Sequence, residues 1–141
     1  MIRIILATHA GLGKAMLDTA AIISGGTEGV QTIELHPGDA TEDVEYALRD
    51  LISIAGKEDI LCLVDIPGGS PARVAASLAI EAPNFHVVSG LNLGMLTETL
   101  LLRNSVGIAG LKEHIMKSAV STITDVGEKF IIALAEEQKE R

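Results

Sequence analysis

Four short apolar runs along the chain have the length of β-strands. They are Ile2–Ala7, Val30–Leu35, Ile60–Val64 and Phe85–Ser89. The first and third runs do not alternate with polar residues, which is typical of strands that are buried on both faces of a parallel sheet. The pattern therefore predicts four strands, at least two of them central.

Between these runs, small or apolar residues recur with the 3.6-residue period of an α-helix. One such stripe begins at Leu12, and a second extends from Val44 to Ala55. The second has Thr41 as a candidate N-cap and is followed by Gly56, a typical C-terminal stop. The pattern predicts a helix in each segment.

A third helix is predicted from Ser70, because Pro71 suits the first helical position and inward-facing apolar residues follow. Two further helices are predicted over Leu96–Arg103 and Leu111–Ile123. The tail Lys129–Leu134 contains a run of apolar residues that fits either a last strand or the end of a helix. Periodicity does not decide between these two.

Strands and helices alternate through most of the chain, which favours a mainly parallel sheet with right-handed connections. The expected fold class is therefore α/β, with a doubly wound sheet and helices on both faces. No repeat, low-complexity segment or linker divides the 141 residues. We expect residues 1–141 to form a single domain.

Composition excludes several classes of function. The chain has 11 basic and 19 acidic residues, a net charge of −8, and 2% aromatic residues. Nucleic acids and anionic membranes need a cationic surface, so neither is an expected partner. One cysteine, Cys62, excludes a disulfide framework, and no stretch approaches the about 20 apolar residues of a membrane span. We expect a cytoplasmic protein.

Polar residues that follow the predicted strands are the first candidates for function. Ligands of open parallel sheets bind beyond the carboxyl ends of the strands, where the strand order reverses. His9 follows the first strand and Asp65 follows the third. If these strands are neighbours, the two side chains lie at one rim of the sheet and can touch.

A histidine beside a carboxylate has a defined chemical use. The carboxylate accepts one ring N–H and fixes the tautomer, which leaves the other ring nitrogen with a free lone pair for a proton or an electrophile. Just downstream, Gly69 and Ser70 provide a bend and a hydroxyl at the start of a helix, which suits an anion such as a phosphoryl group. The combination favours phosphoryl transfer through phosphohistidine. The alternatives are that His9 merely faces solvent and that Asp65 merely caps its turn.

Competing motifs fail at particular positions. The segment Gly11-Leu12-Gly13 begins like a dinucleotide fingerprint, but Met16 stands in place of the third glycine. The same segment lacks the Ser or Thr that follows the lysine of a phosphate-binding P-loop. The histidines have no metal-ligand spacing, so no metal site is expected.

Several of these residues recur together in a known family. They are Thr8-His9, Asp65, Gly68-Gly69-Ser70-Pro71 and Gly90-Leu91-Asn92. With them the chain resembles the IIA component of the mannose family of the bacterial phosphoenolpyruvate-dependent sugar phosphotransferase system, over roughly residues 1–104. At Ile66-Pro67 it departs from the family, which has a polar residue and an aromatic there.

The resemblance implies a role for each site residue. His9 is then the residue that the phosphohistidine carrier protein phosphorylates on Nε2, and that passes the phosphoryl group to a histidine of a IIB component. Asp65 holds the imidazole and Ser70 supplies a hydroxyl near the phosphoryl group. The membrane components IIC and IID are indirect partners, and the resemblance implies no metal or cofactor.

The resemblance also implies a homodimer in which the last strand of each protomer joins the sheet of its partner. We therefore expect Lys129–Leu134 to form an antiparallel edge strand that is exchanged in the dimer, or else a helix on its own chain. Two other functions stay open from the residues. They are the phosphotransfer subunit of a dihydroxyacetone kinase and a non-catalytic module that binds an anion or nucleotide at the same rim.

Overall fold

A parallel sheet forms the centre of the computed structural model, which describes residues 1–141. Its strands are β1 (Arg3–His9), β2 (Val30–Leu35), β3 (Ile60–Val64) and β4 (Phe85–Val88). Their order is β2-β1-β3-β4, and all three neighbouring pairs are parallel. The chain thus reverses its direction of winding between β1 and β3, which are the two central strands.

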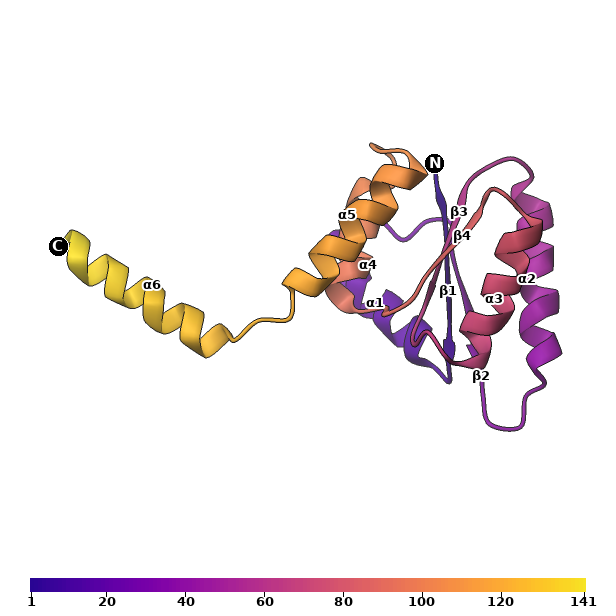
Figure 1. The fold of residues 1–141 in the computed structure, drawn as a ribbon, viewed down its shortest axis with the longest axis horizontal. Helices are drawn as coiled ribbons and strands as arrows, with labels where there is room; N and C mark the ends of the chain where they lie inside the picture. Colours follow the sequence, from indigo (N-terminus) through magenta and orange to yellow (C-terminus); the bar gives the residue numbers. More distant parts are fainter.

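Helices cover both faces of this sheet. They are α1 (Leu12–Ser24), α2 (Thr41–Ala55), α3 (Ser70–Glu81), α4 (Leu93–Leu102), α5 (Ile108–Ser121) and α6 (Val126–Glu140). Figure 1 shows α2 and α3 on one face and α1, α4 and α5 on the other, whereas α6 extends away from both. None of the helices combines the length and apolar character needed to cross a bilayer.

The core consists of two apolar layers separated by the sheet. Along β1, the side chains of Ile4 and Leu6 belong to the layer under α1, α4 and α5, and those of Ile5 and Ala7 belong to the layer under α2 and α3. Every residue of β3 is buried. These two strands therefore have apolar residues on both faces, as the absence of alternation in the sequence predicted.

The predicted elements are confirmed with small changes of bounds. The second and third strands have the predicted ends, while β1 continues to His9, where its backbone still pairs with Leu35 of β2. Helix α2 begins at Thr41, and Ala40 occupies the N-cap position without a side-chain hydrogen bond. The prediction of Thr41 as the N-cap was therefore wrong by one residue.

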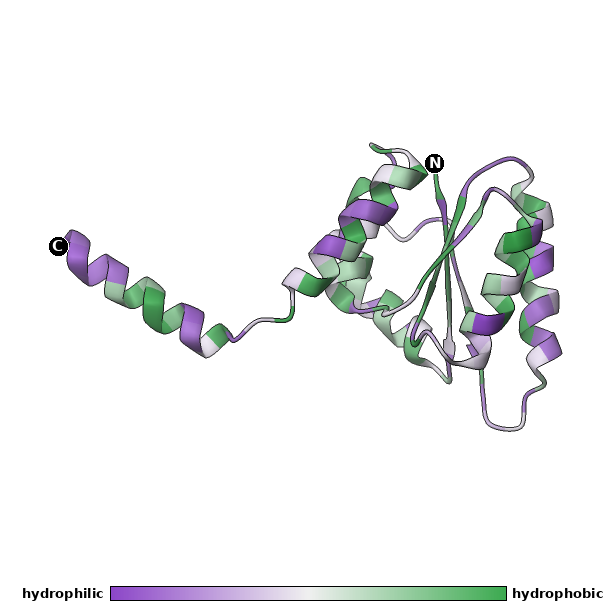
Figure 2. Cartoon of the chain, viewed as in Figure 1, coloured by the Kyte–Doolittle hydropathy of each residue, from purple (hydrophilic) through white to green (hydrophobic).

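The C-terminal segment differs from the prediction of an exchanged edge strand. Lys129–Leu134 lies within α6, and no antiparallel strand joins the sheet. Asp125 caps this helix, because its Oδ1 accepts the backbone N–H of Glu128 at 2.9 Å. No residue of α6 is buried, and Figure 2 shows hydrophobic residues in its middle and hydrophilic ones at its C-terminal end.

Candidate functional site

The end of β1 and the residue after β3 meet at the carboxyl edge of the sheet. His9 is the last residue of β1, and Asp65 directly follows Val64, the last residue of β3. Because β1 and β3 are hydrogen-bonded neighbours at the point where the winding reverses, their ends lie at the crevice in which open α/β sheets bind ligands. The predicted meeting of His9 and Asp65 depends on this strand order.

Two hydrogen bonds join His9 to one carboxylate oxygen. The ring Nδ1 of His9 lies 2.8 Å from Asp65 Oδ2, and the backbone N–H of His9 donates to the same oxygen at 2.9 Å. An ionised carboxylate can only accept, so Nδ1 carries the proton and the lone pair is at Nε2. The His9 side chain is 45% exposed and that of Asp65 10%, so a half-exposed ring lies above a largely covered acid.

The surroundings of Asp65 favour its ionised form. Partial burial alone raises its pKa, but the backbone N–H of His9, the His9 ring and the backbone N–H of Ile66 all donate to the carboxylate. Together these hydrogen bonds hold the pKa of Asp65 below its ordinary value. The acid therefore stays ionised and can stabilise a positive charge on the ring.

A turn at Ala10 fixes the position of His9. Ala10 has φ of 47°, in the left-handed region that residues with a side chain seldom occupy. Its N–H donates to Leu35 O at 2.8 Å, so the chain remains tied to β2 while it bends. Strained backbone of this kind concentrates at functional sites, and here it follows the candidate nucleophile directly.

The start of α3 lies against the free edge of the His9 ring. A Cβ placed on Gly69 would lie 2.5 Å from His9 Cε1 and 3.2 Å from Nε2. Only a residue without a side chain permits this close approach while the ring keeps its bond to Asp65. Gly69 precedes Ser70, the first residue of α3, so the positive end of the helix dipole is directed at the neighbourhood of Nε2.

A depression of about 390 Å³ opens beside the ring. The loops after β1 and β2 and the start of α3 form it, and His9, His36, Asp39 and Ser70 are among its lining residues. His36 is held by Glu34, with Nε2 and Oε2 2.8 Å apart. Of the predicted site residues, His9, Asp65, Gly69 and Ser70 therefore come together.

The other histidines and the cysteine lie apart from this site. His86 contacts Lys112, and His114 pairs with Glu98, both on the α4 and α5 side. Cys62 is fully buried in the middle of β3, which raises the pKa of its thiol to about 12. No three side chains of the metal-ligating types are grouped so that they could hold a metal ion.

The glycine pair that began like a nucleotide motif has a packing role. The hydroxyl of Thr8, which is completely buried, accepts the N–H of Gly13 at 2.9 Å. A Cβ on Gly13 would lie 3.3 Å from both Thr8 Oγ1 and Leu6 Cβ. The segment thus lets α1 begin close to β1, and Thr8 satisfies an N–H at the start of that helix.

Sequence reasoning missed one charged residue near the site. The guanidinium of Arg73 donates from Nη2 to Ser70 Oγ at 3.2 Å. The three-residue spacing between Ser70 and Arg73 on a predicted helix was a signal for this contact, since residues i and i+3 are neighbours on a helix surface.

The same fold occurs in IIA subunits of sugar phosphotransferase systems. The phosphotransferase system component EIIA from Streptococcus agalactiae superimposes with a TM-score of 0.83 and 31% identity, covering 91% of this chain and 99% of that one. The mannose/sorbose specific IIA subunit from Enterococcus faecalis gives a TM-score of 0.82 and 25% identity, over 89% of this chain and 94% of that subunit.

The family model for EIIA-man, the PTS system fructose IIA component, matches residues 3–116, so the chain belongs to this family. It is 30% identical over 119 residues to the sorbose-specific EIIA component of Klebsiella pneumoniae, covering 84% of this chain and 87% of that protein. It is 33% identical over 104 residues, 73% of this chain, to the mannose-specific EIIAB component of Escherichia coli K12. The chain spans only 32% of that longer relative.

Proposed function

We propose that the chain is a phosphocarrier, which accepts a phosphoryl group on His9 Nε2 from the phosphohistidine carrier protein and passes it to a IIB component. The observation that carries the proposal is the hydrogen bond from His9 Nδ1 to Asp65, which leaves Nε2 as the free nucleophile. Membership of the EIIA-man family supports the same reaction. In this proposal residues 1–141 act as one IIA-type domain.

The proposed step exchanges one nitrogen–phosphorus bond for another. The Nε2 lone pair of His9 attacks the phosphorus of the donor's phosphohistidine, and the donor's nitrogen–phosphorus bond breaks with its electron pair returning to the donor ring. The proton on His9 Nδ1 stays in place, so the phosphorylated ring is a cation. Asp65 stabilises this cation, as a carboxylate does beside a histidine that becomes positively charged.

Gly69 and Ser70 are the proposed phosphoryl-binding residues. Backbone N–H groups at the start of a helix attract anions, and the hydroxyl of Ser70 offers a further donor in the depression that also contains His9. The absence of a Cβ at Gly69 leaves room for the phosphoryl oxygens near this helix end.

The proposed partners follow from the same chemistry. The donor and the acceptor each present a histidine, while the membrane components IIC and IID act on the sugar and meet this chain only indirectly. We place the reaction in the cytoplasm and expect neither nucleic acid nor a cofactor to take part. The relatives' names mention mannose, sorbose and fructose, and we propose a sugar of this class as the transported substrate.

Mass spectrometry tests the proposed reaction. The chain is incubated with phosphoenolpyruvate, enzyme I and the carrier protein, and we expect a single acid-labile phosphoryl adduct on His9. The matched control is His9→Ala, which should take up no phosphoryl group and keep its melting temperature, because the His9 side chain lies at the rim rather than in the core. An unmodified wild-type protein, or an adduct that persists in His9→Ala, overturns the proposal. Saturable binding of an anion or nucleotide without any adduct would support the alternative of a binding module.

We also propose a homodimer in which α6 supplies the contact. Phe130, Ile131, Ile132 and Leu134 are all exposed, the least exposed of them by 47%. Leaving such apolar surface in water is unfavourable by about 25 cal/mol per Å². A groove of about 350 Å³, lined in part by Met95, Met116, Val120 and Ile123, offers an apolar surface that α6 of a second copy can cover.

Light scattering tests the proposed dimer. We expect the full-length chain to have the mass of a dimer at micromolar concentration and a chain truncated after Gly127 to be a folded monomer. A full-length monomer, or a truncated chain that remains a dimer, contradicts the proposal. Circular dichroism of the truncated chain checks that residues 1–121 keep their fold.

A further inference from the structure

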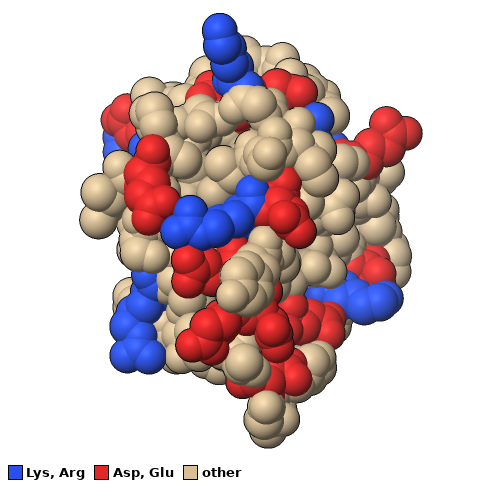
Figure 3. All heavy atoms as spheres, turned by 90° about the vertical axis from the view of Figure 1, so that its right-hand side faces the viewer, with Lys and Arg blue, Asp and Glu red and all other residues tan.

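Arg73 is a cation without an acidic partner beside the candidate site. Its side chain is exposed on α3, and no carboxylate lies within ion-pair distance of it. Arg49 on the neighbouring helix is, in contrast, held by both Glu45 and Glu81 at 2.9 Å. Figure 3 shows the face of the molecule formed by α2 and α3, where acidic groups lie beside several of the basic ones.

The one hydrogen bond of the Arg73 side chain is directed toward the site. Its Nη2 donates to Ser70 Oγ at 3.2 Å, and Ser70 lines the depression beside His9. Gly69, the preceding residue, lies against the Cε1–Nε2 edge of the ring. The guanidinium therefore contacts the hydroxyl of a residue that lines the same depression as His9.

Phosphorylation of His9 changes the charge of this space. The phosphoryl group itself carries a charge of about −1.5 to −2 and three strong acceptor oxygens, and it is placed beside the His9 ring on a chain with a net charge of −8. A guanidinium has five N–H donors in a planar fork that matches two phosphoryl oxygens at once. One N–H of Arg73 is used by Ser70, so the others remain available.

We infer that Arg73 binds the phosphoryl oxygens of phosphorylated His9, together with the hydroxyl of Ser70. The inference rests on the proposed function, because it needs a phosphoryl group on Nε2. Arg73 takes no part in the bond exchange itself. By contacting the phosphoryl group in the carried state but having no acidic partner in the free state, it favours retention of the group on this chain.

The test is the equilibrium of phosphoryl groups between the carrier protein and this chain, measured by separating the four species after incubation without phosphoenolpyruvate. Arg73→Gln should lower the equilibrium constant for phosphorylation of this chain about tenfold, the size expected for one charge-assisted hydrogen bond. Arg73→Lys keeps the charge without the fork and should lie between Arg73→Gln and the wild type. Added salt should lower the equilibrium constant of the wild type toward that of Arg73→Gln, because salt screens the attraction between the guanidinium and the phosphoryl group. The constant of Arg73→Gln should change less.

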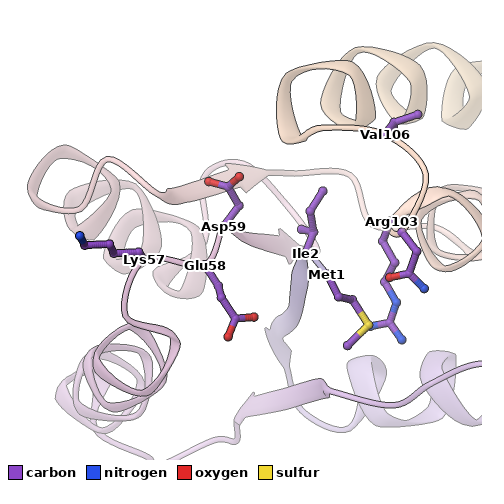
Figure 4. Close-up of a pocket in the computed structure, with 8 residues that line it drawn as sticks. Met1, Ile2, Lys57, Glu58, Asp59, Arg103 and Val106 are labelled. Atoms are coloured by element: carbon purple, nitrogen blue, oxygen red, sulfur yellow. The ribbon is translucent and has the colours of Figure 1, made fainter.

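Lys57→Gln is the matched control for net charge. Lys57 has no hydrogen bond or ion pair and lies at the opposite edge of the sheet, where Figure 4 shows it pointing outward. Its substitution removes the same unit of charge and should leave the equilibrium constant unchanged. A change equal to that of Arg73→Gln would mean that overall charge is responsible, and would overturn the inference.

Ser70→Ala separates a direct contact from support of the hydroxyl. If Arg73 binds the phosphoryl group itself, Arg73→Gln should still lower the equilibrium constant severalfold in the Ser70→Ala background. If Arg73 only orients Ser70, the second substitution should have no further effect, and the inference is wrong.

A wild-type protein that is never phosphorylated contradicts the proposed function. A phosphorylated wild type whose constant is matched by Arg73→Gln contradicts this inference alone. The melting temperatures of all variants serve as folding controls, and they should stay nearly constant because Arg73 and Lys57 are exposed and Ser70 is only half-buried.

Discussion

The two edges of the sheet have surface depressions of similar volume, but their polar side chains differ in their hydrogen-bond partners. At the carboxyl edge the depression beside His9 measures about 390 Å³, and at the amino edge a depression of about 360 Å³ is lined by residues that include Ile2, Glu58 and Arg103 (Figure 4). Each edge contains basic and acidic groups. Size and charge therefore do not distinguish them.

The accessibility of the unpaired atoms does distinguish the two edges. At the amino edge Arg3 pairs with Glu58 at 3.1 Å, and Arg103 donates from Nη2 to the backbone oxygen of Glu28. The Nε and Nη1 atoms of Arg103 lack partners, but they are completely covered in a side chain that is 5% exposed. At the carboxyl edge the unpaired atom is Nε2 of the half-exposed His9. The polar groups of the amino edge hold loops together, whereas the carboxyl edge has an unpaired nitrogen on a half-exposed side chain.

Among substitutions that test the difference between the two edges, Asp65→Asn at the carboxyl edge should have the largest effect, a loss of transfer rate. The amide fills the same space but neither fixes the ring tautomer nor stabilises a positive ring. We expect single-turnover phosphoryl transfer to slow by roughly 10- to 10³-fold, below the about 10⁴ of the comparable change in serine proteases. Binding of the carrier protein, measured by calorimetry, should change little. An unchanged transfer rate would mean that Asp65 only caps its turn.

Arg103→Ala should affect stability and leave transfer intact. The substitution removes the bond to Glu28 O and the packing of a buried aliphatic stem, so we expect the free energy of unfolding to fall by about 2 kcal/mol. Urea unfolding measures the loss, and single-turnover transfer is compared at a temperature where both proteins are folded. A slower transfer in the folded variant would contradict the view that the amino edge contributes only to stability.

Gly69→Ala should affect transfer and leave stability nearly intact. The new Cβ would lie 2.5 Å from His9 Cε1, so the ring has to turn and its bond to Asp65 is disturbed. We expect about tenfold slower transfer, because small displacements of reacting groups have effects of this order. The control is Gly68→Ala, where an added Cβ meets nothing within 4 Å. Equal rates for both variants would show that the close approach is unimportant.

The smallest expected effect concerns stability in acid. The folded pKa of Asp65 lies below its unfolded value, so its ionisation stabilises the protein above the unfolded pKa. This contribution should be lost as the pH falls through the folded pKa. Melting temperatures between neutral and acidic pH should therefore converge for wild type and Asp65→Asn. Asp50→Asn is the control, because the exposed Asp50 has no hydrogen-bond partner; its difference from wild type should not follow that pattern.

The two central strands could be predicted from local sequence, because β3 is apolar throughout and β1 contains the uninterrupted apolar run Ile4-Ile5-Leu6. The tail could not, because Phe130-Ile131-Ile132 fits a strand or a helix equally well. The deciding signal lay just before it: Asp125 followed three residues later by Glu128 is a helix-start pattern, and Asp125 does cap α6.

The pairing of His9 with Asp65 could also be predicted, since it follows from strand order and loop position alone. The approach of Gly69 to the ring could not. It depends on how far α3 is shifted along the sheet, which is a property of packing between layers. Sequence patterns identify which elements pack against each other. They do not give the relative positions of those elements accurately enough to say whether a single added carbon atom would fit.

His9 and Asp65 lie 56 positions apart in the sequence, and this distance has a consequence for biosynthesis. During translation β1 leaves the ribosome first, but its nucleophile lacks an orienting acid until β3 has been made and inserted beside it. A nascent or partly unfolded chain therefore has a histidine with neither a fixed tautomer nor a helix end next to it. In the proposed function, competence to receive a phosphoryl group arises only with the completed central strand pair, so incompletely folded copies should not withdraw phosphoryl groups from the proposed donor.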